Sequence, residues 1–166
     1  AFDVDRFVND LKEEAVSKLH AKQILSGSYP TIIKGKAMAN LLGCLIIQLN
    51  GEQVAKGISL LKDSLDRQIF DEKVSLIDDP FMEDGIQSTP FDDEGVACRR
   101  KELVAHGILQ GYLHHLKSAK ALHMEATGNG FGADISHTNL YLAQGDNTFT
   151  DMIRTMKNGV VISDVT

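Results

Sequence analysis

The period of the hydrophobic pattern changes several times along the chain. Apolar residues recur every three or four positions over residues 4–19, directly after Asp3, which predicts an amphipathic helix with an aspartate N-cap. Residues 38–49 repeat the helical spacing but add apolar residues on other sides. We therefore predict a second helix that is buried on most sides, ends in a left-handed cap at Asn50-Gly51 and forms the centre of the domain.

Shorter runs of β-type residues predict strands around these helices. The stretch ELVAHGILQGYL has two such runs on either side of His106-Gly107, which predicts a tight hairpin. The strands follow one another without regular crossover helices, so we expect an α+β fold with an antiparallel or mixed β-sheet packed around the buried central helix. Strands are predicted at 31–35, 73–80, both arms of 102–113, 139–143 and 160–165, and short helices at 118–124 and 148–159.

Composition and charge exclude several classes of protein. With 166 residues, 43% of them hydrophobic, the chain is long enough for one folded domain with its own core. A net charge of −6 without basic–aromatic runs argues against direct nucleic-acid binding, and the apolar run LLGCLIIQL is too short to span a membrane. Two distant cysteines, Cys44 and Cys98, favour reduced thiols and a cytoplasmic location.

The stretch STPFDDEGVACRR offers the first candidate chemistry. Asp92, Asp93 and Glu94 could act as a general acid and base if their surroundings separated their pKa values. The alternative is a polar turn in which aspartate binds the backbone, Gly95 takes a positive φ, and Arg99 or Arg100 pairs with an acid across the strands. The turn is the better-supported interpretation.

Two further motifs are weaker candidates for a phosphate-binding or metal site. GNGFG, at 128–132, follows a helix-like stretch and leads to a strand, which is the wrong context for a phosphate-binding loop. Five histidines fall within 106–137, but successive side chains on a strand point to opposite faces, so His114 and His115 should not share one metal site. We expect a structural loop and scattered imidazoles.

Several segments taken in order resemble the TldD/PmbA family, also described as peptidase family U62 and as proposed modulators of DNA gyrase. They are the Asp-Asp-Pro strand end, the Phe-Asp-x-Glu-Gly turn, the Gly-Tyr-Leu hairpin arm, the Thr-Gly-Asn loop, NLYLAQGD and MIRTMKNGVVISDV. The resemblance implies that residues 1–27 are a helix and linker from a preceding domain. It also implies that 28–166 are the central portion of a longer TldD/PmbA-like domain, truncated at its C-terminus.

The resemblance further implies a hydrolase, a metalloprotease in which a TldD-type subunit and a PmbA-type (TldE) subunit form a dimer that cleaves unfolded peptides. The metal-bearing subunit carries His-Glu-x-x-x-His on a helix. The matching positions in this chain are Gly43, Cys44 and Gln48, so both histidines are absent. Glycine has no ligand atom and a glutamine amide is a poor substitute for imidazole at zinc. The resemblance is thus to the PmbA/TldE-like branch.

We therefore expect a non-catalytic subunit with no catalytic residues and no metal of its own. Zinc is expected on a TldD-like partner, although a homodimer is an alternative, and extended peptide is the expected substrate. Asp92, Glu94 and Arg99 are the candidate substrate-binding residues. Two other functions stay open: a stand-alone metallohydrolase using Cys44, Gln48 and the later histidines, and a gyrase-linked scaffold or interaction module without a proteolytic role.

Overall fold

The computed structural model of the chain describes residues 2–165 and divides into two compact units, Ala1–Pro30 and Thr31–Thr166. The first unit contains helix α1 (Val4–Ser17), whose N-cap Asp3 accepts the backbone N–H of Arg6 through Oδ1 at 3.0 Å. The predicted helix and its cap are therefore confirmed. No residue of α1 is buried within its own unit.

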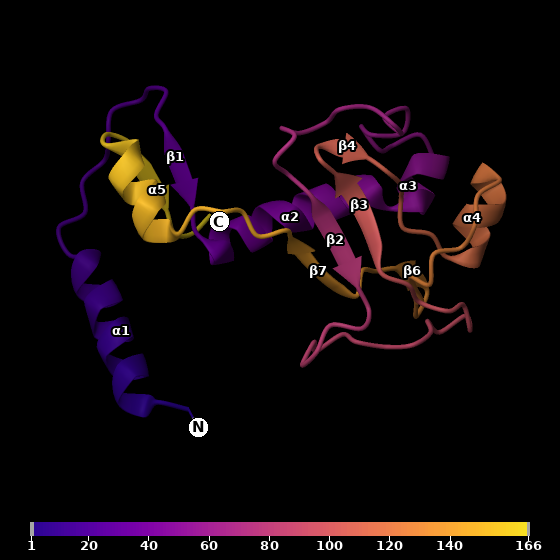
Figure 1. Ribbon diagram of the computed structural model, residues 1–166, viewed down its shortest axis with the longest axis horizontal. Helices are drawn as coiled ribbons and strands as arrows, with labels where there is room; N and C mark the ends of the chain where they lie inside the picture. Colours follow the sequence, from indigo (N-terminus) through magenta and orange to yellow (C-terminus); the bar gives the residue numbers. More distant parts are fainter. Residues whose placement is uncertain (1, 166) are drawn as a thin grey trace. The chain divides into compact units, whose positions relative to one another are not determined.

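The second unit combines helices and short strands around one main sheet (Figure 1). Across residues 2–165, no helix has the length and apolar character needed to cross a bilayer. The elements of the second unit are β1 (Thr31–Ile33), α2 (Gly35–Leu49), α3 (Gly51–Ala55), β2 (Leu76–Asp79), β3 (Lys101–Ala105), β4 (Ile108–Leu109), α4 (Leu116–Leu122), β5 (Gly130–Phe131), β6 (Asp134–Ile135), β7 (Asn139–Leu142), α5 (Phe149–Met156) and β8 (Val160–Ile162).

The main sheet has four strands in the order β4-β3-β2-β7, and all of its pairings are antiparallel. The register between β2 and β3 shifts between Leu76 and Ile77. β1 and β8 form a separate parallel pair, and β5 and β6 form a small antiparallel pair. The α+β class with an antiparallel or mixed sheet is therefore confirmed.

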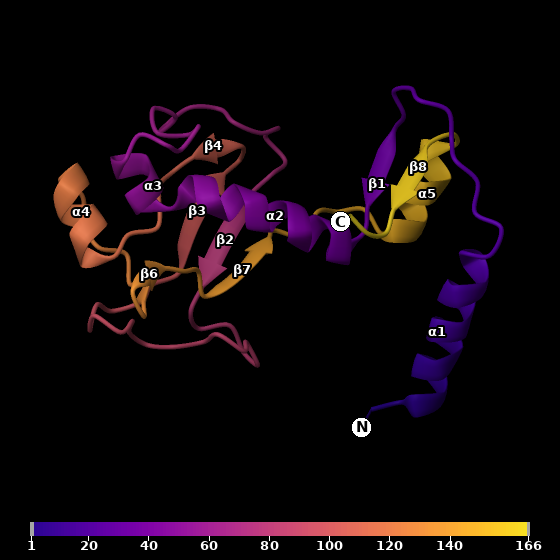
Figure 2. The same cartoon turned by 180° about the vertical axis from the view of Figure 1, so that it is seen from behind.

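Helix α2 covers one face of this sheet, in front of the strands in Figure 2. Its residues Leu42, Leu45 and Ile46 pack against the buried core formed by the sheet and the segments around it. Only Ala37 and Leu49 are fully buried, however, and Ile47 is 58% exposed. The prediction of burial on most sides is wrong for this chain, because no described element covers the other apolar side of α2.

The end of α2 also differs from the prediction. Asn50 is extended, with φ −72° and ψ 116°, and its side-chain Oδ1 accepts the backbone N–H groups of Glu52 and Gln53. Asn50 therefore caps the start of α3 rather than forming a left-handed end to α2. Gly51 is needed for space, because a Cβ there would overlap the imidazole of His114.

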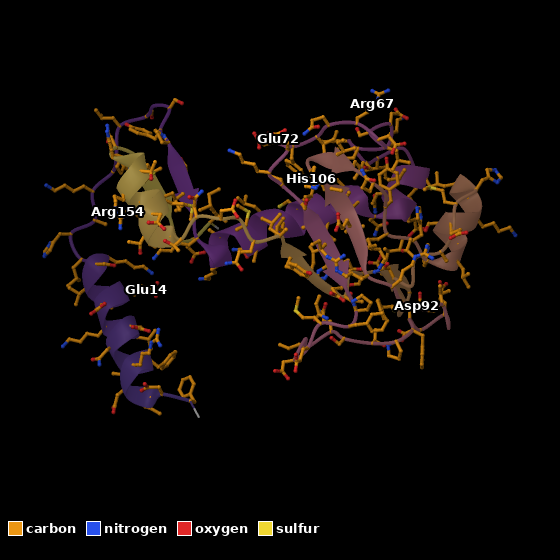
Figure 3. All side chains as sticks on the ribbon, viewed as in Figure 1. Glu14, Arg67, Glu72, Asp92, His106 and Arg154 are labelled. Carbon is orange, nitrogen blue, oxygen red and sulfur yellow. The ribbon has the colours of Figure 1, made fainter. Side chains whose placement is uncertain are left out.

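The hairpin between β3 and β4 agrees with the sequence. His106 and Gly107 have φ values of 48° and 78°, and two successive positive φ angles define the tight turn that suits a twisted two-strand ribbon. Figure 3 shows His106 at one end of the main sheet and Asp92 toward the other. The candidate residues of the charged turn thus lie away from the hairpin tip.

Candidate functional site

The charged turn is held together by Asp92, which is 2% exposed. Its Oδ1 accepts the backbone N–H groups of Glu94 at 3.1 Å and Val96 at 2.9 Å, and its Oδ2 accepts that of Gly130 at 2.9 Å. Gly95 has φ 78°, as the turn interpretation requires. Three backbone donors satisfy this carboxylate, so Asp92 connects the turn to the glycine-rich loop.

The two neighbouring acids also bind backbone groups. Glu94 Oε2 accepts the N–H of Leu116 at 2.7 Å, and Asp93 Oδ2 accepts that of Gly132 at 2.6 Å. The turn is therefore bound to the start of α4 and to the glycine-rich loop. This loop contains β5 and places Asn129 in a fully buried position, where its side chain donates to Asp78 and to the carbonyl of Ser136, which confirms that it is structural.

The most deeply buried charge was not predicted from the sequence. Asp78 is fully buried, and its Oδ1 accepts the backbone N–H and the hydroxyl of Thr138 at 2.7 and 2.6 Å. Its Oδ2 accepts Lys101 Nζ at 2.9 Å and Asn129 Nδ2 at 3.0 Å. Burial alone would raise the pKa of Asp78, but Lys101 and Thr138 stabilise the anion and hold that pKa below its ordinary value.

A groove of about 610 Å³ lies between residues 99–103, 110–114 and 123–127. Leu103 and Tyr112 contribute apolar surface, and Lys101 and Arg99 contribute positive charge. Arg99 Nη2 lies 3.4 Å from Glu125 Oε2 in an exposed ion pair. Of the three predicted substrate-binding residues, Arg99 lines this groove, whereas Asp92 and Glu94 bind backbone groups and are not among the lining residues.

Arg100 pairs instead with acids of the main sheet. Its guanidinium lies 3.6 Å from Asp79 at the end of β2 and 3.6 Å from Glu102 on β3. A pairing of Arg100 with an acid across the strands is therefore confirmed. The buried pair is formed by Lys101, the residue after Arg100, and Asp78, the residue before Asp79.

His114 and His115 lie at the base of α4, where the chain has left the sheet. His114 Nδ1 is 3.2 Å and His115 Nδ1 is 2.9 Å from the same atom, Ser118 Oγ. The prediction that these side chains point to opposite faces is wrong, because His115 is already the N-cap of a helix. Within residues 2–165, no group of three or more His, Cys, Asp or Glu side chains is placed to hold a metal ion.

A serine beside two histidines resembles a nucleophile with its base, but this serine cannot meet a substrate. Ser118 is 1% exposed and its hydroxyl donates to the carbonyl of His115 at 3.1 Å. His114 is also 1% exposed, and burial, with a smaller contribution from His115, lowers its pKa to about 4. The cluster is therefore built for packing rather than for hydrolysis.

The α2 positions that the family resemblance implies for zinc do not fit a metal. Gly43 has no donor atom, and the Cys44 thiol is exposed on the helix surface. Gln48 Oε1 already accepts the backbone N–H of Leu60 at 2.8 Å. One thiol and one occupied neutral amide are not a zinc-binding set.

Comparison with known proteins gives a family. Residues 26–166 match the family model described as the PmbA/TldA metallopeptidase C-terminal domain. The chain belongs to the PmbA/TldD metallopeptidase family. The resemblance inferred from the charged turn and the strand motifs is thereby confirmed.

Relatives in the family extend well beyond this chain. It is 28% identical to the metalloprotease PmbA of Escherichia coli O157:H7, over 94% of this chain and 34% of that protein. A crystal structure from Thermotoga maritima, of a proposed modulator of a DNA gyrase, is 40% identical with TM-score 0.88 over 93% of this chain and 36% of that one. TldE from Thermococcus kodakarensis is 27% identical with TM-score 0.83, over 96% and 38%. The chain spans about a third of the length of the curated relatives it matches.

Proposed function

We propose that this chain is part of a non-catalytic, PmbA/TldE-like subunit of a TldD/TldE-type metalloprotease complex that processes unfolded peptides. The observation that carries the proposal is the chemistry of α2, where Gly43, an exposed Cys44 and a hydrogen-bonded Gln48 replace the metal-binding motif. Without these ligands the helix cannot hold a zinc ion that activates water. The metal would then reside on a TldD-type partner subunit.

The groove beside Arg99 is the candidate surface for extended peptide. Its volume of about 610 Å³ falls in the range of small-ligand pockets, and it combines apolar walls with a few charged groups. Arg99 is 56% exposed and paired with Glu125 at 3.4 Å, so a peptide carboxylate could replace Glu125 at little cost. Asp92 and Glu94 would contribute indirectly, by fixing the loops beside the groove.

The proposal that zinc and peptide cleavage depend on a TldD-type partner is tested on the full-length protein, produced alone and together with a TldD-type subunit. Each preparation is analysed for zinc by elemental analysis and for cleavage of an unfolded peptide. We expect zinc and cleavage only when the partner is present, and co-purification of the two subunits. Stoichiometric zinc in the protein alone would favour a stand-alone metallohydrolase, and failure to associate with the TldD-type subunit would favour an interaction module.

The peptide groove is tested separately with a fluorescent unfolded peptide and the reconstituted complex. Arg99→Ala should weaken peptide binding several-fold, because it removes a charge that lines the groove. Arg67→Ala is the matched control, since Arg67 is exposed and lies outside the groove lining. Equal peptide affinity in both variants would remove Arg99 from the proposed site.

A further inference from the structure

The N-cap of α4 is a histidine whose ring contacts Ser118. His115 Nδ1 accepts the backbone N–H of Ser118 at 3.1 Å. The same nitrogen lies 2.9 Å from Ser118 Oγ, so the backbone N–H and the hydroxyl of Ser118 both lie against the His115 ring.

The neighbouring imidazole of His114 is buried where a positive charge would be unfavourable. His114 is 1% exposed, its Nδ1 lies 3.2 Å from Ser118 Oγ, and its Nε2 has no hydrogen-bond partner among the described residues. The ring packs against Gly51 of α3 and meets Tyr112 edge-on at 6.3 Å between centroids. A proton added here would place a positive charge in a dry site with no counter-ion.

The charged and titratable groups around the two rings would not neutralise a positive charge on His114. Glu94 is the acid on the turn beside α4, and its Oε2 already accepts the N–H of Leu116. Glu52 on α3 is paired with Lys117 at 2.8 Å and Lys56 at 3.4 Å. Lys117 and Lys120 add positive charge on α4 itself. Tyr112 does not help, because burial raises its pKa and keeps the phenol neutral.

The segment that follows α4 forms one wall of the groove. His123, Met124, Glu125 and Thr127 line it. Thr127 binds the backbone of His114: its Oγ1 accepts the His114 N–H at 2.7 Å and lies 3.1 Å from the His114 carbonyl, and its own N–H donates to that carbonyl at 3.2 Å. A shift of the His114 backbone would therefore also move residues 123–127.

We propose that His114 and Ser118 form an acid-sensitive latch, which holds α4 and the 123–127 wall in place while the His114 imidazole is neutral and releases them when that ring is protonated. This latch does not depend on the proposed peptidase role. The result of acidification is a wider and more mobile groove, with the main sheet intact.

The size of the effect follows from His114. Its pKa lies at about 4 in the closed state and at the ordinary 6.5 once the ring is in water, so protonation favours the open state. Lowering the pH from 7 to 5 then raises the population of the open state about 20-fold.

The test is amide hydrogen exchange of the full chain by NMR at pH 7 and pH 5, with protection factors corrected for intrinsic exchange. Protection of residues 116–127 should fall about 20-fold at pH 5 and should stay below that of β2 and β3, whose amides lose no more than the same factor because global unfolding also exposes His114. In the double variant His114→Gln, His115→Asn, whose amides do not titrate and whose Asn can still cap, the fall should disappear. His106→Gln, at the exposed hairpin turn, is the matched control and should behave like the wild type.

Two results would overturn the latch. One is unchanged protection of residues 116–127 in the wild type between pH 7 and pH 5. The other is a fall of equal size in the double variant. If the double variant does not fold, the wild-type His114 Cε1–H signal decides: it should titrate well below pH 6 together with the α4 amides, and titration without any change in those amides would also overturn the proposal.

Discussion

Among the polar groups of the second unit, the buried carboxylate of Asp78 should be the one whose replacement lowers the free energy of unfolding most. Its two oxygens accept four hydrogen bonds, from Thr138, Asn129 and Lys101. In Asp78→Asn, one oxygen becomes an NH₂ group. If the remaining oxygen stays with Thr138, this NH₂ faces the ammonium of Lys101 and the amide of Asn129, which are both donors.

The expected cost follows from the loss of the counter-ion. The Lys101 side chain is 13% exposed, so Asp78→Asn leaves a nearly buried positive charge unpaired. Breaking a buried ion pair from one side costs about 3–5 kcal/mol. Since the folded pKa of Asp78 lies below its ordinary value of 3.8, the stabilisation is fully present above that value and is lost as the pH falls through the lower folded pKa. The full effect should therefore be seen at pH 7.

Urea unfolding of the full chain, followed by far-UV circular dichroism, measures this cost. Asp63→Asn is the matched control, because Asp63 is 79% exposed and lies 4.0 Å from Lys62. The control should change the unfolding free energy by less than about 0.5 kcal/mol. The double variant Asp78→Asn, Lys101→Met should recover part of the loss, because it removes the orphaned charge. A cost below about 1 kcal/mol for Asp78→Asn at pH 7 would refute the reasoning.

Three further predictions concern packing, pH and thiols. Gly51→Ala should lower the unfolding free energy by at least about 1–3 kcal/mol in urea unfolding, because the added Cβ overlaps His114, whereas Gly43→Ala, in open space on α2, should raise it by up to about 1 kcal/mol. The contribution of neutral His114, at most about 3 kcal/mol, is present above pH 6.5 and is lost as the pH falls toward 4, so the urea midpoint should decline over that interval. Cys44 is exposed and should react with a thiol reagent well before Cys98, whose pKa is raised by burial. Equal reaction rates, a flat pH profile or a neutral Gly51→Ala would each contradict the corresponding contact.

The sequence predicted those features of the fold that depend on local chemistry. The Asp3 cap, the hairpin at His106-Gly107 and the aspartate turn at Asp92 each follow from residues a few positions apart. Contacts distant in sequence escaped prediction. Asp78 and Thr138 meet across 60 residues through the β2–β7 pairing, which no local pattern encodes.

The errors share a related cause. Asn50 was assigned to the end of α2, whereas it caps α3, because Asn suits either position and only tertiary contacts decide. His114 and His115 were placed on one strand, whereas a helix begins there and brings both rings to Ser118. The apolar content of α2 did predict a core helix but not how many of its sides this chain covers.

The exposure and hydrogen bonding of the polar side chains give evidence on function that is independent of the missing metal ligands. A hydrolytic site needs a carboxylate, imidazole or hydroxyl that is accessible and not already satisfied. Asp92, Glu94 and Ser118 each bind backbone groups, and His114 is shielded from solvent. The polar chemistry of the second unit is thus used to join loops, and exposed Arg99 in the groove is the predicted residue left to meet a ligand. This pattern is what the proposed non-catalytic role would require of these residues.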